Sequence, residues 1–174
     1  MFIKLALSIL GGAALCAAPS FAQATAAAGM GAAEFLKMAA EADMTTTHIG
    51  RMAEERATTD AVRDFSKKLV QDNTSDYNQV CELAAKTGNN VPKAIDKQDD
   101  REITTLDKHK GKAFDRAFLA EESTGNEKLI KAFQQEAEHG DNPDIKAYAN
   151  RTLPILEGNL HEAQDLLKTK VHKT

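Results

Sequence analysis

The chain has 174 residues and a formal net charge of −4, with 22 basic and 26 acidic side chains. This mildly acidic balance argues against a nucleic-acid-binding protein, which would carry clustered basic charge. The length suits one domain with a buried core. The two cysteines are Cys16 and Cys81, and removal of the segment described next would leave Cys81 alone, which excludes a disulfide framework.

The first 24 residues have the organisation of a cleavable secretion signal. Lys4 supplies one positive charge, an apolar run follows over residues 5–18, and residues 19–24 end in small side chains. A basic start, an apolar stretch of about 7–15 residues and a small-x-small exit are typical of such signals. A retained membrane anchor is the weaker alternative, because a spanning helix needs roughly 20 apolar residues.

We expect cleavage after Ala22 or Ala24, followed by a flexible leader over residues 25–31 and one helical domain over residues 32–170. Export would place the protein in the periplasm, with attachment to the outer membrane as an alternative. After cleavage the chain has no further segment long and apolar enough to span a membrane.

Apolar residues recur at intervals of three and four from Phe35 onward, which predicts amphipathic helices. The first helix is expected to end near Arg56, and residues 57–60 supply capping side chains for the second. The second helix is expected to stop at Gly88, a residue suited to the left-handed conformation past a helix end.

A connection over residues 89–97 leads to a short helix over roughly residues 99–108. A third long helix is expected to begin near Gly111 and to close at Gly140. The pattern of a strand, alternating every second residue, is absent from the sequence.

The last helix opens at Asn142-Pro143, where Asn142 is expected to cap it and Pro143 fits the first turn. Pro154 inside this helix should kink it. The sequence therefore predicts an all-α, up-and-down four-helix bundle with one extra short helix between the second and third long helices.

Each long helix interrupts its apolar stripe with polar residues that should face the interior: Thr46 in the first, Asp72, Asn73 and Asp76 in the second, Glu122 and Asn126 in the third, and Asn159 in the fourth. Inward carboxylates and imidazoles are the usual way in which a bundle holds two iron or manganese ions. The histidines fall elsewhere, since His161 is turned roughly 200° from Asn159 and His48 lies to the side of its helix. We interpret the set as a buried network of amides and carboxylates without a metal.

Several pieces of the sequence resemble domain of unknown function 4142, over roughly residues 31–168. The pieces are Phe65…Asp72-Asn73, Phe114-Asp115-Arg116-Ala117-Phe118, Leu129…Phe133…Glu136-Ala137 and Leu153-Pro154…Leu156…Asn159-Leu160. The resemblance implies an exported bacterial ferritin-like bundle of a kind often labelled as an outer-membrane protein.

The sequence departs from that family at the positions that would bind a metal. The family pattern usually has histidine where this chain has Asn73, Asn126 and Asn159, and glutamate where it has Thr46; only Asp72 is retained. Asparagine can imitate one hydrogen bond of an imidazole but is a poor ligand for iron, manganese or zinc. The resemblance therefore implies a degenerate metal site, and we expect the three amides to meet inside the bundle.

We expect a non-catalytic protein without a cofactor, acting in stress tolerance or binding an unknown protein or small-molecule partner in the cell envelope. The alternative is a metal-binding or redox-active protein that uses Asp72, Asp76 and Glu122. An interaction module using the charged faces over residues 51–56 and 96–102 is a third reading. The sequence carries no Ser-His-Asp set, phosphate-binding glycine loop or nucleotide fingerprint, and it leaves the oligomeric state open.

Overall fold

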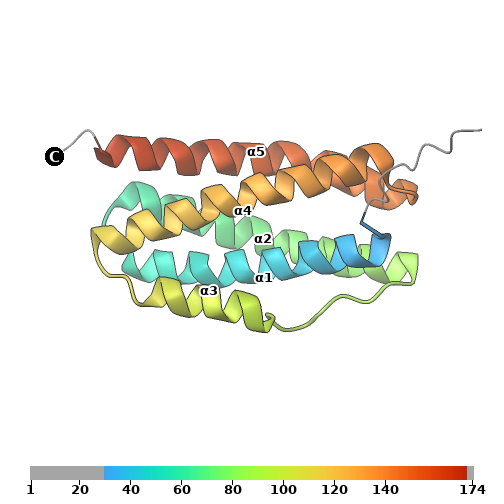
Figure 1. Cartoon of the computed structure of the whole chain (residues 1–174), viewed down its shortest axis with the longest axis horizontal. Coiled ribbons are helices and arrows are strands. Elements are labelled where there is room, and N and C mark those ends of the chain that lie inside the picture. Colours follow the sequence, from blue (N-terminus) through green and yellow to red (C-terminus); the bar gives the residue numbers. More distant parts are fainter. Residues whose placement is uncertain (1–29, 172–174) are drawn as a thin grey trace, which may run out of the picture.

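The computed structural model describes residues 30–171, which form five helices and no strand. The helices are α1 (Ala32–Arg56), α2 (Asp60–Thr87), α3 (Lys97–Asp107), α4 (Lys112–His139) and α5 (Pro143–Val171). The four long helices lie side by side in an up-and-down bundle, and the short α3 runs along its outside (Figure 1). The predicted fold class is confirmed. The signal expected over residues 1–24 and nearly all of the leader over 25–31 fall outside the described residues.

The ends of the helices are set by the capping residues that the sequence indicated. The Thr59 side chain accepts a hydrogen bond from the backbone N–H of Val62 at 3.4 Å, and Gly88 adopts the left-handed conformation with φ 72°. Asn142 Oδ1 accepts from the N–H groups two and three residues on, at 2.9 and 3.2 Å. The short helix begins two residues earlier than expected, because Asp96 caps it through the N–H groups of residues 98 and 99.

The bundle is built from two antiparallel helix pairs. α1 packs chiefly on α2 and α4 chiefly on α5, whereas the contacts between the two pairs are sparser. Gly50 allows the close approach of α1 to α2, since a Cβ at this position would lie 2.8 Å from Val70 Cγ2. α3 bridges the two pairs by contacting α1 and α4. No helix within residues 30–171 has the length and hydropathy needed to cross a membrane.

The buried apolar side chains form two clusters, one toward each end of the bundle. One cluster contains Phe65 and Phe118, and it takes its residues from the end of α1, the start of α2, α3, the start of α4 and the last turns of α5. The other contains Phe35, Phe133 and Tyr148, with the rings of Phe35 and Phe133 edge to face at 4.8 Å. The residues between the clusters on each long helix include those that the sequence marked as polar interruptions of its stripe.

Asp115 joins the first turn of α4 to the connection between α1 and α2. Its carboxylate is fully buried and accepts from the Thr58 N–H at 3.0 Å and from the Thr58 hydroxyl at 2.6 Å. Nearby, the Arg56 guanidinium lies 4.4 Å from the centre of the Phe114 ring and donates to Asp107 Oδ1 at 2.6 Å. These contacts fix the end of the bundle where the α1–α2 connection, the end of α3 and the start of α4 meet.

Replacement of Asp115 by alanine should lower the free energy of unfolding by about 3 kcal/mol, because two hydrogen bonds to a charged acceptor are lost in a buried site. Urea titration followed by circular dichroism would measure the change. Asp64→Ala, which removes an exposed carboxylate on α2, is the matched control and should change stability by less than about 0.5 kcal/mol. Equal effects of the two substitutions would contradict the anchoring role of Asp115.

Candidate functional site

Polar side chains from all four long helices form a belt between the two apolar clusters. The belt comprises Asp43 and Thr46 on α1, Asp72, Asn73 and Asp76 on α2, Glu122 and Asn126 on α4, and Asn159 on α5. Of these, Asp43, Glu122, Asn126 and Asn159 are buried, and the others are partly exposed. The sequence-predicted residues therefore share one level of the bundle, although they differ in burial.

The belt is divided between two cavities on different sides of the bundle. The α3 cavity, about 390 Å³, lies between α1, α3 and α4 and is lined by Thr46, Glu122 and Asn126. The α5 cavity, about 500 Å³, opens between α2 and α5; its belt residues are Asp43, Asp72, Asn73, Asp76 and Asn159. Ala42 and Leu129 line both cavities and separate them. The three amides therefore do not line one common cavity, since Asn126 lines the α3 cavity and the other two line the α5 cavity.

Glu122 is the most deeply buried acid of the α3 cavity, with 3% of its surface exposed. Asn126 Nδ2 donates to the backbone carbonyl of Glu122 at 2.8 Å and lies 3.5 Å from its Oε2, while Oε1 has no hydrogen-bond partner among the described residues. Burial raises the pKa of Glu122 to about 8, and the charge of Glu121 acts in the same direction. The carboxyl of Glu122 is therefore mainly protonated at neutral pH.

Asp43 is a buried acid of α1 that the sequence analysis missed. It is 5% exposed, and its Oδ2 has no hydrogen-bond partner in the described part of the chain. Burial raises its pKa well above the ordinary range, and the nearby charge of Asp76 adds to the effect. The available signal was its position four residues after Ala39, on the buried stripe of α1. α1 thus contributes an acid to the belt, one turn before the half-buried Thr46.

Asp76 is held by a hydrogen bond across the bundle. The Tyr148 hydroxyl, on α5, donates to Asp76 Oδ2 at 2.6 Å. Burial raises the pKa of Asp76, while the hydrogen bond from Tyr148 and the charge of Arg151 act against that rise. Burial and the two neighbouring carboxylates raise the pKa of Tyr148, which keeps its hydroxyl as the donor. This contact joins the two helix pairs at the inner edge of the α5 cavity.

Lys68 brings a positive charge to the α5 cavity, and the sequence analysis did not consider it. Its ammonium donates to Asn159 Oδ1 at 2.6 Å and lies 3.5 Å from Glu162 and 3.9 Å from Asp72. The i,i+4 spacing of Lys68 and Asp72 was the signal that could have indicated the pair. Asn73, which also lines this cavity, donates to the Leu69 carbonyl of its own helix at 2.8 Å.

The residues of the belt do not fit a two-metal centre. Among residues 30–171 no group of three or more histidine, cysteine, aspartate or glutamate side chains is close enough to hold a metal ion. His48 and His161 are exposed, and His161 pairs with Asp165 at 3.3 Å, while His172 is not among the described residues. The acids are split between two cavities, and the Lys68 ammonium already donates a hydrogen bond to the Asn159 amide oxygen.

Glu122→Gln should remove a pH dependence of stability. The folded-state pKa of about 8 exceeds the ordinary value of 4.5, so the folded protein holds the extra proton between these values. The free energy of unfolding should therefore fall as the pH rises through this window, by up to ~1.4 kcal/mol per pH unit for this group. The variant should be more stable than the natural protein at pH 8 and similar near pH 4.

Urea midpoints measured from pH 4 to pH 9 would test this expectation. Glu82→Gln, an exposed position on α2, is the matched control and should leave the profile unchanged. A profile for Glu122→Gln that follows the natural protein at every pH would show that the buried carboxyl does not cause the pH dependence.

Comparison with known proteins places this architecture in a family. No curated protein matches the chain. Among solved structures, a DUF305 fragment from Deinococcus radiodurans is similar with a TM-score of 0.70 and 12% identity, over 79% of this chain and 95% of that one. CopM in its Cu(II)-bound form has a TM-score of 0.67 and 10% identity, over 78% of this chain and 95% of that one. At such identities the likeness concerns the fold alone. The model of the family described as Domain of unknown function (DUF4142) matches residues 17–166, and the chain belongs to that family.

Proposed function

We propose that this chain is an exported, non-catalytic binding protein of the cell envelope, and that its polar belt works without a metal. The observation that carries the proposal is the contact of the Lys68 ammonium with Asn159 Oδ1 at 2.6 Å, beside Asp72 and Glu162. The protein's own cation thereby neutralises the acids at the mouth of the α5 cavity. A metal ion there would have to displace it against charge repulsion.

The chemistry of the remaining donors supports the same proposal. Carboxylates bind metal ions in their ionised form, and burial disfavours that form in Asp43 and in Glu122. An asparagine carbonyl is a weak ligand for transition metals. The belt therefore serves better as a set of hydrogen-bonding groups than as a metal centre.

Binding is favoured over catalysis by the two cavities. Volumes of about 390 and 500 Å³ lie within the ~300–1,000 Å³ range of small-molecule sites. Cys81, the one described cysteine, is half-buried and lines neither cavity. In the described residues, the histidines that could act as general bases also lie outside both cavities.

Export is supported by the order of residues 1–24: one basic residue, an apolar run and a small-x-small exit. The proposed location is the periplasm, and attachment to the outer membrane is the alternative location. A role in stress tolerance fits an envelope binding protein.

The alternative function is metal binding. It is favoured by the position of Asp43 in the same cavity as Asp72 and Asp76, and by the Cu(II)-bound form of CopM, which has a similar fold. Under this alternative, Lys68 would swing out when the metal enters, and its position in the metal-free protein would be a resting state.

Metal addition separates the two functions. Protein purified from the native envelope should contain much less than one equivalent of iron, manganese, copper or zinc by elemental analysis. Its melting temperature should barely change when these ions are added. A ligand at 100 times its Kd would instead add ~2.7 kcal/mol, a shift of several degrees.

Lys68→Met sharpens this test, because it removes the ammonium while keeping most of the side-chain volume. The natural protein and the variant should both stay metal-free if the donors themselves are unsuitable. Stoichiometric metal in the natural protein that disappears in Asp76→Asn would overturn the proposal and favour the alternative.

Processing of the first 24 residues provides a test of export. Mass spectrometry of periplasmic extracts should find a chain that begins at Gln23 or Thr25. A chain expressed without residues 1–24 is the control and should stay in the cytoplasm. Recovery of the uncleaved chain in the inner membrane would contradict the proposal.

A further inference from the structure

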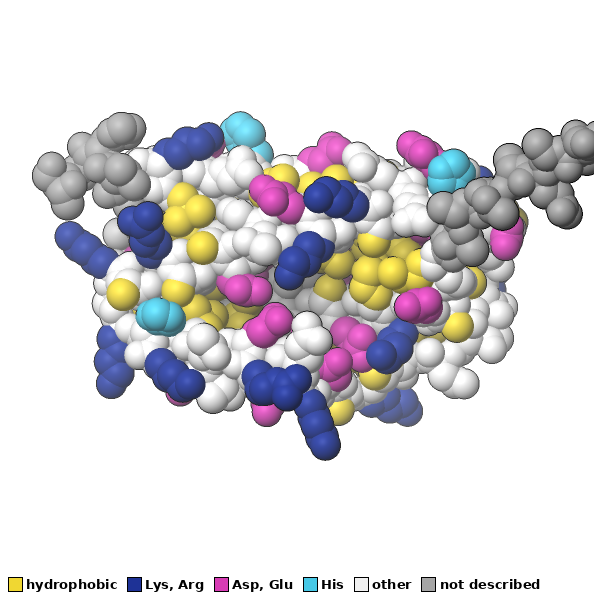
Figure 2. All heavy atoms as spheres, viewed as in Figure 1, with side chains coloured by type: hydrophobic (Ala, Val, Ile, Leu, Met, Phe, Trp, Pro, Cys, Tyr) yellow, Lys and Arg dark blue, Asp and Glu magenta, His cyan; other side chains and the backbone are white. Residues whose placement is uncertain are grey.

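The α3 cavity collects acidic side chains from three helices. Its carboxylates come from Glu41 on α1, from Asp96, Asp99 and Glu102 at and within α3, and from Glu121 and Glu122 on α4. Figure 2 shows acidic side chains gathered near the centre of this face, beside apolar surface. Basic side chains lining the cavity are limited, among described residues, to Lys128.

Three of these carboxylates already have partners within the protein. Glu41 pairs with Lys37 at 3.3 Å, Asp96 caps α3, and Asp99 accepts from the Thr45 hydroxyl at 2.9 Å. Glu102 and Glu121 form no ion pair or hydrogen bond within residues 30–171. Burial raises the pKa of Glu121 and the charge of Glu102 adds to the rise, while the charge of Lys128 acts against it.

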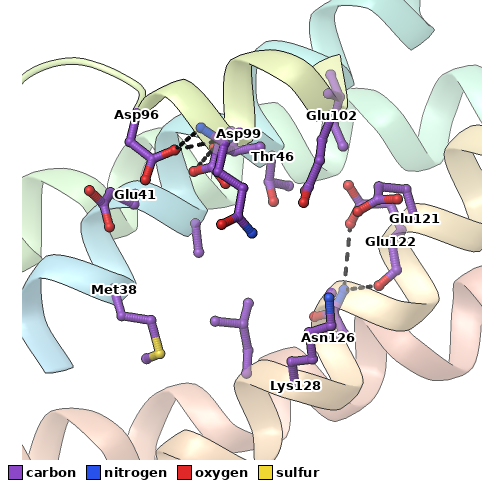
Figure 3. Close-up of a pocket in the computed structure, with 16 residues that line it drawn as sticks. Met38, Glu41, Thr46, Asp96, Asp99, Glu102, Glu121, Glu122, Asn126 and Lys128 are labelled. Atoms are coloured by element: carbon purple, nitrogen blue, oxygen red, sulfur yellow. Dashed lines mark hydrogen bonds between the residues drawn. The ribbon is translucent and has the colours of Figure 1, made fainter. Parts of the chain in front are cut away.

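Glu122 is an independent observation that points to a ligand. Its Oε1 is buried at the wall of the cavity and has no hydrogen-bond partner in the described structure, although its residue is only 3% exposed. In Figure 3 the side chains of Glu102, Glu121 and Glu122 approach one another from α3 and α4. A buried oxygen without a partner is costly, by ~1–3 kcal/mol, unless a donor reaches it.

The shape and walls of the cavity indicate the class of ligand. Its volume of about 390 Å³ is far larger than one ion needs, and Met38, Ile49 and Leu129 give it an apolar side. Within residues 30–171 no three acids are close enough together to hold a metal ion. A neighbouring cavity of about 320 Å³ shares Gln98, Glu102 and Glu121 with it, so the site extends along α3.

We propose that the α3 cavity binds an aliphatic polyamine, whose ammonium groups contact Glu102, Glu121 and Glu122 and whose methylene chain lies on the apolar wall. The inference rests on the binding role proposed above and names its ligand class. Ammonium groups on a flexible hydrocarbon chain match carboxyl groups from two helices beside an apolar surface. One ammonium would also supply the missing donor for Glu122 Oε1.

Isothermal titration calorimetry of the mature protein with spermidine tests the proposal. We expect saturable binding of one spermidine per chain that weakens as salt is added. n-Butylamine, with one ammonium group, should bind at least tenfold more weakly. The double variant Glu102→Gln/Glu121→Gln should also lose at least tenfold in affinity, and circular dichroism would verify that it is folded.

Asp100→Asn is the matched control, because Asp100 lies exposed on the same helix but does not line the cavity. It should retain the spermidine affinity. An equal loss in this variant would mean diffuse charge attraction and would overturn the proposal, as would the absence of saturable binding. Tighter binding of Mg²⁺ or Ca²⁺ that is lost in the double variant would overturn it in favour of a divalent-cation site.

These outcomes are separate from those of the metal and export tests. If the protein is metal-free and exported but does not bind spermidine, the polyamine proposal is wrong and the proposed function stands. If the protein binds spermidine and also carries stoichiometric metal in the α5 cavity, the polyamine proposal stands and the proposal of a metal-independent function is wrong.

Discussion

The cost of removing carboxyl groups from water governs the middle of this bundle. Asp43 and Glu122 are buried at the level where the two apolar clusters end, and each has an oxygen without a partner among the described residues. An ionised carboxylate there would be strongly destabilising, so the protonated form is favoured and the pKa of each rises. The belt therefore lowers the stability of the fold, and it presents buried carboxyl oxygens to which a ligand could donate hydrogen bonds.

The packing of the helices in pairs leaves cavities beside these buried acids. Because α1–α2 and α4–α5 pack closely within each pair and loosely across, cavities remain on both sides of the bundle. The two cavities differ in whether their acidic side chains are paired with other groups of the protein. In the α5 cavity Lys68 contacts Asn159 and Asp72, and Tyr148 donates to Asp76, whereas Asp43 Oδ2 has no partner among the described residues. In the α3 cavity Glu102 and Glu121 form no ion pair among the described residues, and Lys128 is the one described basic side chain that lines the cavity.

The resemblance to the family and the geometry of the site differ on where the amides at positions 73, 126 and 159 lie. The departures at Asn73, Asn126 and Asn159 suggested three amides gathered in one place, but they fall on two sides of the wall made by Ala42 and Leu129. Each amide also has its own partner: the Leu69 carbonyl, Glu122 and Lys68 respectively. The motif Phe114-Asp115 has a structural role, since its acid anchors the α1–α2 connection.

The sequence by itself determined the helices, their caps and the level of the polar belt, because these depend on periodicity and on hydrogen bonds within a few residues, as at Thr59, Gly88 and Asn142. It did not determine which polar groups meet. Asp43 and Thr46 lie one turn apart on α1, and the sequence pattern indicated only Thr46. Lys68 contacts Asn159 although the two residues are 91 positions apart in the sequence. Only the tertiary structure decided those pairings, because the rotation and spacing of the packed helices set which side chains come within hydrogen-bond distance.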